Sequence, residues 1–122
     1  MKKKIRLKNS QEIGKIVLKK QRISSPFYNL YYLYNQPNTK IAIVAGKKCG
    51  GAIERNYLKR TMREIIRPNV EKFENIHAVL IAKEKALEIS YTKKQDVINN
   101  MILQLLERIK KWEKLMLKTL RW

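Results

Sequence analysis

The sequence predicts an α+β fold, a single-domain α/β sandwich whose elements follow in the order α-β-β-β-α-β-α. Three observations lead to this prediction. The chain has 122 residues, of which 44% are hydrophobic, so it can form one domain with a modest core. Short runs rich in β-branched and aromatic residues alternate with stretches of helical periodicity. Their order along the chain is typical of helices packed against one sheet.

The first expected elements are a basic, extended arm at residues 1–8 and a short helix from Ser10 to about Lys20. Asn9, followed three residues later by Glu12, has the pattern of a capping box at the start of this helix. One face of the helix is apolar and consists of Ile13, Ile16 and Val17.

Strand character dominates the next part of the chain. Residues 28–35 (YNLYYLYN) and 40–45 (KIAIVA) both predict strands, and the polar turn NQPNT between them predicts that they pair as a β-hairpin. A short edge strand is expected within residues 21–26. Residues 77–83 (HAVLIAK) predict a further strand, buried because its run is nearly all apolar.

The last predicted helix follows a connection at residues 86–91, and Thr92 with Gln95 forms a second capping-box pattern. Its apolar stripe consists of Val97, Ile98, Met101, Ile102, Leu105, Leu106 and Ile109. We expect the domain to span residues 1–110 and residues 111–122 to form a helical extension or tail. The apolar residues of this tail, Trp112 among them, could fold back on the sheet, pair with another chain, or remain partly disordered.

The stretch from Lys47 to Arg67 carries seven basic residues against two acids. The pair Gly50 and Gly51 indicates a turn and Pro68 indicates a stop, so the run between them predicts a helix. One i, i+4 row on that helix consists of Arg55, Lys59, Arg63 and Arg67. A basic row can be simply solvated, but this one has no interleaved acids to pair with. Its mixture of arginine with asparagine favours contact with nucleic acid.

The total charge points the same way. Lysine and arginine number 28 against 10 acids, which gives a formal net charge of +18. Nucleic acid is therefore the first candidate partner, and an anionic membrane surface is the second. No apolar run is long enough for a transmembrane helix, and no signal peptide is recognisable. The single cysteine excludes an internal disulfide and is compatible with a reducing cytoplasm.

A catalytic set is not recognisable in the sequence. His77 is the only histidine, and Cys49 has only basic neighbours, which could lower the pKa of its thiol, although a small residue filling a turn is the better interpretation. The carboxylates are scattered, without the spacing of a metal site. We therefore expect no catalytic and no metal-binding residue in the chain.

The stretch KKCGGAIERNYLKRTMREIIR resembles the signature of the bacterial ribonuclease P protein subunit, and the resemblance extends over residues 3 to about 110. Tyr57 departs from the signature, since the family usually has an arginine there, and it could stack on RNA or pack in the core. The matching residues are Lys47, Lys48, Gly50, Ala52, Arg55, Asn56, Lys59, Arg60, Arg63 and Glu64.

The resemblance implies a function and a fold. In the family the RNA subunit is the catalyst and uses magnesium ions, whereas the protein binds no cofactor of its own. The protein would bind ribonuclease P RNA and the 5′ leader of precursor tRNA, in the cytoplasm, without a membrane and with at most weak self-association. The family also has an unusual left-handed strand–helix–strand crossover, which residues 40–83 would form.

Two site surfaces are implied by the matching positions. The first would meet the catalytic RNA and consists of Lys47, Lys48, Arg55, Asn56, Lys59, Arg60 and Arg63. The second is a cleft for the leader between the first helix and the sheet, at Ile13, Val17 and Tyr31. The family commonly has phenylalanine at the first two positions, so base stacking on the helix side should be weaker here. Other tyrosines of the same strand could compensate for this if they also face the cleft.

Two other functions remain open from the sequence. One is a ribosomal or other structural RNA-binding protein, because the same fold class occurs in ribosomes. The other is a protein that binds an anionic membrane or a partner through its tryptophan-containing tail.

Overall fold

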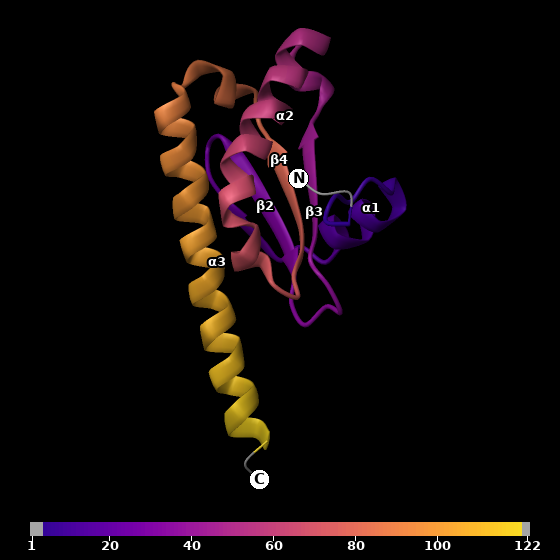
Figure 1. Cartoon of the computed structure of the whole chain (residues 1–122), viewed down its shortest axis with the longest axis vertical. Coiled ribbons are helices and arrows are strands. Elements are labelled where there is room, and N and C mark those ends of the chain that lie inside the picture. Colours follow the sequence, from indigo (N-terminus) through magenta and orange to yellow (C-terminus); the bar gives the residue numbers. More distant parts are fainter. Residues whose placement is uncertain (1–3, 121–122) are drawn as a thin grey trace.

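The computed structural model describes residues 4–120, and within them one sheet is packed between helices (Figure 1). The strands and α-helices are α1 (Ser10–Leu18), β1 (Arg22–Ser24), β2 (Tyr28–Leu33), β3 (Lys40–Ala45), α2 (Ala52–Ile66), β4 (His77–Ala82) and α3 (Tyr91–Leu120). Three short 3-10 helices connect them: η1 (Lys47–Cys49), η2 (Arg67–Phe73) and η3 (Glu84–Glu88). The predicted fold class and order of elements are confirmed.

The strands form a four-stranded sheet in the order β1-β2-β4-β3 within residues 4–120. Strand β4 pairs antiparallel with β2 and parallel with β3. The predicted hairpin of residues 28–35 with 40–45 is therefore wrong, because β4 lies between these two strands. On its other side β2 pairs antiparallel with β1, the strand that precedes it in the sequence. The physical reason is burial: five of the six residues of β4 are apolar, and the central position covers both of its faces, with Ala78, Val79 and Leu80 at most 1% exposed.

The outer edge of β3 is covered by the N-terminal arm. The Leu7 amide donates to the Ile41 carbonyl at 2.9 Å, and the Ile41 amide donates to the Ile5 carbonyl at 2.7 Å. The arm is thus extended, as predicted, from Arg6 onward, whereas Lys4 and Ile5 form a turn. Residues 1–3 lie outside the described residues. This pairing satisfies an edge that would otherwise expose free backbone groups.

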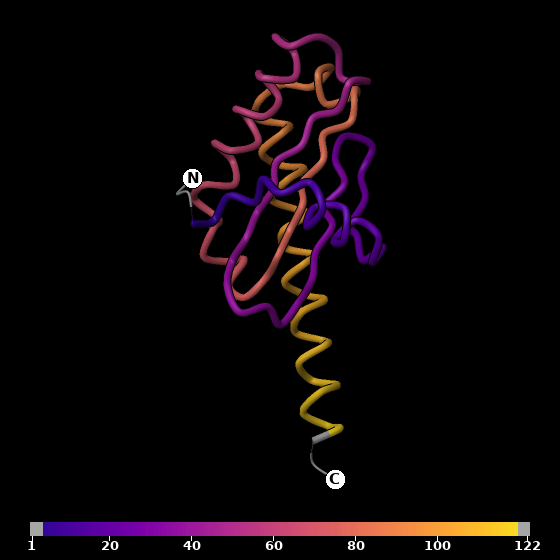
Figure 2. The backbone as a smooth tube through the Cα atoms, turned by 90° about the vertical axis from the view of Figure 1, so that its right-hand side faces the viewer, coloured from indigo at the N-terminus to yellow at the C-terminus, as the bar shows by residue number. Residues whose placement is uncertain are grey.

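The connection from β3 through α2 to β4 has the unusual hand. In Figure 1 both strands run upward, β4 lies to the left of β3, and α2 passes in front of them. Figure 2, turned by 90°, places α2 on one side of the sheet and α1 on the other. A crossover that moves leftward in front of upward-running strands is left-handed, an exception to a rule that holds in about 98% of cases.

Each face of the sheet has its own apolar cluster. The larger cluster joins α2 and α3 to the sheet and contains Tyr28, Leu30, Tyr32, Ile41, Leu58, Met62, Ile66, Phe73, Ile98, Met101 and Leu105. The smaller cluster lies under α1 and contains Leu7, Ile16, Tyr31, Ala42 and Val79, with Ile13 and Val17 packed against it. Neighbouring residues of β2 therefore point to opposite faces, as the two-residue period of a strand requires.

The helix starts agree with the sequence at α1 and differ at α3. The Asn9 side chain accepts the amides of Gln11 at 2.9 Å and Glu12 at 3.3 Å, so Asn9 is the N-cap of α1, which confirms its part of the predicted capping box. At α3 the predicted cap, Thr92, is wrong. Ser90 caps the helix instead, because its hydroxyl accepts the Lys93 amide at 3.1 Å and Thr92 already lies inside the first turn.

Helix α3 continues without interruption to Leu120, beyond the sheet (Figure 1). Its first part packs in the larger cluster, as its apolar stripe predicts. Further along α3, Trp112 stacks on Tyr34, the residue that directly follows β2, with 5.5 Å between ring centroids. Leu115 and Leu117 remain 63% and 62% exposed. Residues 111–120 thus form the predicted helical extension. Residues 121–122 lie outside the described residues.

Candidate nucleic-acid interface

A tight loop sets the two lysines of the signature on the surface. Lys47 and Lys48 are exposed in η1, whereas Cys49 next to them is 2% exposed and its thiol donates to the Ala82 carbonyl at 3.4 Å. Gly50 has a φ of +108°, which side chains rarely adopt, and an added Cβ would lie 3.2 Å from the Glu54 Cβ. The buried Cys49 therefore anchors the loop to the end of β4, and Gly50 allows the chain to turn sharply.

Burial raises the pKa of the Cys49 thiol above its ordinary value. A buried thiol of raised pKa contains little thiolate at neutral pH and is a poor nucleophile. Of the two interpretations of Cys49, the small residue that fills a turn fits the structure, and the reactive thiol does not.

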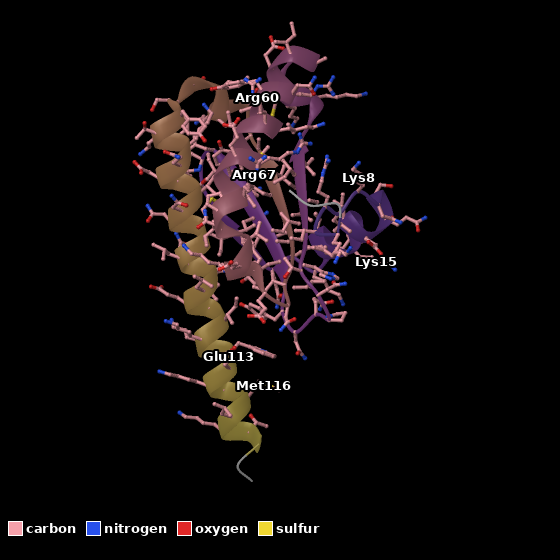
Figure 3. The ribbon with its side chains drawn as sticks, in the orientation of Figure 1. Lys8, Lys15, Arg60, Arg67, Glu113 and Met116 are labelled. Atoms are coloured by element: carbon pink, nitrogen blue, oxygen red, sulfur yellow. The ribbon has the colours of Figure 1, made fainter. Side chains whose placement is uncertain are left out.

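Helix α2 buries one face and presents the basic face outward. Leu58, Met62 and Ile66 are at most 1% exposed. Asn56, Arg60 and Arg67 are exposed, and Figure 3 labels Arg60 and Arg67. Arg55, Lys59 and Arg63 are half-buried, and Lys59 and Arg63 lie on the side of the helix that looks toward the N-terminal arm. The 3.6-residue period thus divides the helix into a core face and a cationic face.

Tyr57, the residue that departs from the signature, lies on the surface and not in the core. It is 36% exposed, and its ring is 5.2 Å from the Lys94 ammonium and 5.9 Å from the Arg60 guanidinium. Both distances are within the range of cation–π contacts. Tyr57 therefore contacts two cations through its ring, but it lacks the positive charge that an arginine would have at this position.

A pocket of about 230 Å³ lies between α2, α1 and the arm. Four cations, Arg6, Lys8, Lys59 and Arg63, line it together with Leu7, Ile13, Ile41 and Ile43. The buried Nε of Arg63 has no hydrogen-bond partner among residues 4–120. Burial, and secondarily the charge of Arg6, lower the pKa of Arg63. Converging cations with an unsatisfied buried donor make this pocket suited to an anionic group such as a phosphate.

Arg6 and Lys8 are missed by the sequence interpretation as site residues. Their only signal in the sequence is the alternation of apolar and basic residues from Ile5 to Lys8, which is the pattern of an extended segment. Their position beside α2 follows from the pairing of the arm with β3, which no local pattern reveals.

The predicted cleft residues all belong to the smaller cluster, but they face two different pockets. Ile13 lines the cationic pocket described above, whereas Val17 and Tyr31 line a second pocket of about 400 Å³ with Leu18, Lys20 and Arg22. Tyr31 is only 8% exposed, and an Arg22 guanidinium nitrogen donates to its hydroxyl at 3.4 Å. Among the tyrosines of β2, Tyr28 and Tyr32 point into the larger cluster, so Tyr31 alone of these three faces α1.

A third pocket, of about 530 Å³, lies beside the η1 loop. Lys47 and Lys48 line it with Lys83 and Glu84 from the end of β4 and with Asn29 of β2. Lys83 is fixed there by its ammonium, which donates to the Ser25 carbonyl at 2.7 Å. Lys83 is a further cation that the sequence interpretation does not include, because its closeness to η1 depends on the pairing of β3 with β4.

The groups that could perform chemistry are engaged elsewhere. His77 lies 2.8 Å from the Asn38 side-chain oxygen, and burial, together with the charge of Lys40, lowers its pKa. Within residues 4–120 no group of three histidine, cysteine, aspartate or glutamate side chains lies together as metal ligands would. In the same part of the chain, no helix combines the length and the apolar character that crossing a membrane requires.

The sequence matches the family model described as Ribonuclease P over residues 1–110. The Ribonuclease P protein component of Finegoldia magna is 27% identical over 99 residues, which cover 80% of this chain and 88% of that protein. The Ribonuclease P protein component of Mycoplasma capricolum is 27% identical over 113 residues, which cover 90% of this chain and 100% of that protein.

Solved structures with the same fold include two RNase P proteins. The protein from Staphylococcus aureus matches with a TM-score of 0.75 and 20% identity, over 82% of this chain and 94% of that one. The protein from Thermotoga maritima matches with a TM-score of 0.67 and 24% identity, over 84% of this chain and 96% of that one. At these identities the likeness shows the shared fold alone.

Proposed function

Since the chain belongs to the Ribonuclease P protein family, we propose that it is the protein subunit of ribonuclease P, the endoribonuclease that removes the 5′ leader from precursor tRNA. In this proposal the RNA subunit carries the chemistry with its magnesium ions. The protein holds that RNA with one surface and the single-stranded leader with another.

One observation supports the proposal most strongly. Ile13 of the predicted leader cleft and Lys59 and Arg63 of the predicted RNA-binding helix line the same pocket. The two surfaces implied by the signature therefore meet at this pocket, which Ile41 and Ile43 of β3 also line. A protein built this way can hold two RNA segments next to each other, as positioning a leader beside a catalytic RNA requires.

The outer face of α2 and the η1 loop suit a folded RNA backbone. Lys47, Lys48 and Arg60 are exposed, and Asn56 between them can donate to phosphate or base edges. Arginine adds a planar pair of donors that matches phosphate geometry. With a net charge of +18, binding should weaken steeply as salt rises.

The cleft on the other face of the sheet suits a single strand. Lys20 and Arg22 supply cations for its phosphates, and Val17 and Leu18 supply apolar contacts for its bases. Tyr31 is only 8% exposed, so stacking in this pocket is limited. The leader would be held chiefly by its backbone, which favours binding with little dependence on base identity.

Cleavage assays at low magnesium test the proposed function directly. The purified protein alone should not cleave precursor tRNA, because its histidine and cysteine are engaged in structural contacts. Added to ribonuclease P RNA, it should lower the magnesium concentration needed for cleavage at the 5′ end of the mature tRNA, because its cations replace part of the counterion charge. Cleavage by RNA-free protein, or an unchanged magnesium requirement, would contradict the proposal.

Single substitutions on α2 test the first surface. Arg60→Ala and Lys59→Ala should each weaken binding to ribonuclease P RNA by about tenfold, the loss expected for one charge-assisted hydrogen bond of about 1.5 kcal/mol. Each should also reduce the slope of log affinity against log salt by about 0.7 to 1. Lys118→Ala is the matched control, since it removes one exposed charge at the far end of α3. Equal losses at all three positions would mean that net charge alone drives binding.

The cleft is tested with precursor and mature tRNA, which differ by the leader. Tyr31→Ala should lower the ratio of precursor to mature affinity of the holoenzyme by about fivefold, the low end for one stacked base, because Tyr31 is mostly buried. Ile16→Ala is the matched control: it is 2% exposed in the same cluster and lines neither pocket. If Ile16→Ala changes the ratio as much as Tyr31→Ala, the effect comes from loosening α1 and the leader does not lie against Tyr31.

A further inference from the structure

We propose that Trp112 and Tyr34 form a second, aromatic subsite for the single-stranded leader, beyond the cleft under α1. The occupant would be a nucleotide of the leader, with its base stacked on the indole and its phosphate beside a lysine. The inference rests on the proposed function, which it extends to a part of the chain outside the region that the family model matches.

The subsite is an open pocket with an aromatic wall. The rings of Tyr34 and Trp112 are stacked, with centroids 5.5 Å apart and planes inclined by 27°. Both side chains are half-buried, so part of each ring remains accessible. The pocket has a volume of about 320 Å³ and is lined by Lys19, Gln21, Leu33, Tyr34, Gln36 and Trp112.

The aromatic pair is held in place before any ligand arrives. One turn ahead of Trp112 on α3, a guanidinium nitrogen of Arg108 donates to the Arg22 carbonyl and to the Tyr32 hydroxyl, both at 2.8 Å. The Tyr32 ring in turn lies 5.1 Å from the Tyr34 ring. These contacts fix α3 against the sheet, so that the indole meets Tyr34. A rigid platform loses little conformational entropy when a base stacks on it.

The lining chemistry fits a nucleotide. The six lining residues include one cation and no carboxylate, which favours an anionic ligand. The Gln36 amide nitrogen donates to the Tyr34 carbonyl at 2.8 Å, so this side chain is fixed at the aromatic wall and its amide oxygen remains as an acceptor for a base edge. An aromatic surface beside a lysine is the combination that non-specific single-strand binding proteins use.

The subsite continues the leader cleft. Residues 19–22 lie between the two pockets: Lys20 and Arg22 line the cleft, while Lys19 and Gln21 line the aromatic pocket. Lys20 adopts a φ of 60°, so the chain turns there, and the neighbouring side chains serve different pockets. A single strand leaving the cleft can therefore follow the lysines of this turn directly onto Trp112.

Leader length separates the two pockets in an experiment. The full-length protein is reconstituted with ribonuclease P RNA, and affinity is measured for precursor tRNAs with a graded series of leader lengths and for mature tRNA. Trp112→Leu should lower affinity for the longest leaders by about fivefold or more and leave the shortest leaders and mature tRNA unchanged. Leu115→Ala, a 63% exposed position on the same helix, is the matched control and should change none of them.

The outcomes distinguish the subsite from the proposed function. If the unchanged protein binds long leaders more tightly than short ones and Trp112→Leu keeps that difference, the subsite is refuted and the proposed function stands. If the unchanged protein shows no dependence on the leader at all, the proposed function fails first.

A fluorescence measurement keeps the inference testable even if Trp112→Leu is poorly folded. The chain has two tryptophans, so Trp122→Phe leaves Trp112 as the only one. Stacking of a base should quench its fluorescence when long-leader precursor tRNA binds, and mature tRNA should not quench it. Unchanged Trp112 fluorescence with saturating long-leader precursor would overturn the inference.

Discussion

Strand β4 lies between β2 and β3 with both faces buried, and the positions of both candidate RNA surfaces depend on this. Because β4 runs parallel to β3, the chain must cross one face of the sheet between them, and α2 is that crossing. Its basic side is thereby set along the edge of β3. Helix α1 is left to cover the other face, and the arm closes the edge between them. Apolar burial in the centre of the sheet thus determines where the charges lie.

The cationic surface is built at an electrostatic cost that an RNA partner would remove. Arg6 and Arg63 lie near each other at the pocket between α1 and α2, and the repulsion contributes to the lowered pKa of Arg63. Since the chain carries 28 basic residues and 10 acids, most of its cations have no carboxylate with which to pair. Such a surface favours phosphate, because the charge of a polyanion relieves the repulsion among its cations.

The helices and strands could largely be predicted from local patterns. The period of α2, its stop at Pro68 and the Asn9 cap are signals within a few residues, and all are present in the structure. The predicted hairpin failed because strand order depends on which apolar run takes the centre of the sheet, and that is a competition over the whole chain. The same holds for the candidate site. The signature contains Lys59 and Arg63, which could therefore be predicted. Arg6, Lys83 and Trp112 each line a different pocket, and tertiary contacts that no local pattern reveals bring them there.

The central claim is that the two faces of one sheet hold different RNAs, and tethered hydroxyl-radical cleavage tests it most directly. In a Cys49→Ser background, an iron chelate is attached at Leu18→Cys beside the cleft or at Ile53→Cys at the start of α2, positions that are 77% and 83% exposed. In the holoenzyme with precursor tRNA, the probe at residue 18 should cut the leader, and the probe at residue 53 should cut ribonuclease P RNA and leave the leader intact. Cleavage of the leader from residue 53, or none from residue 18, would contradict the account.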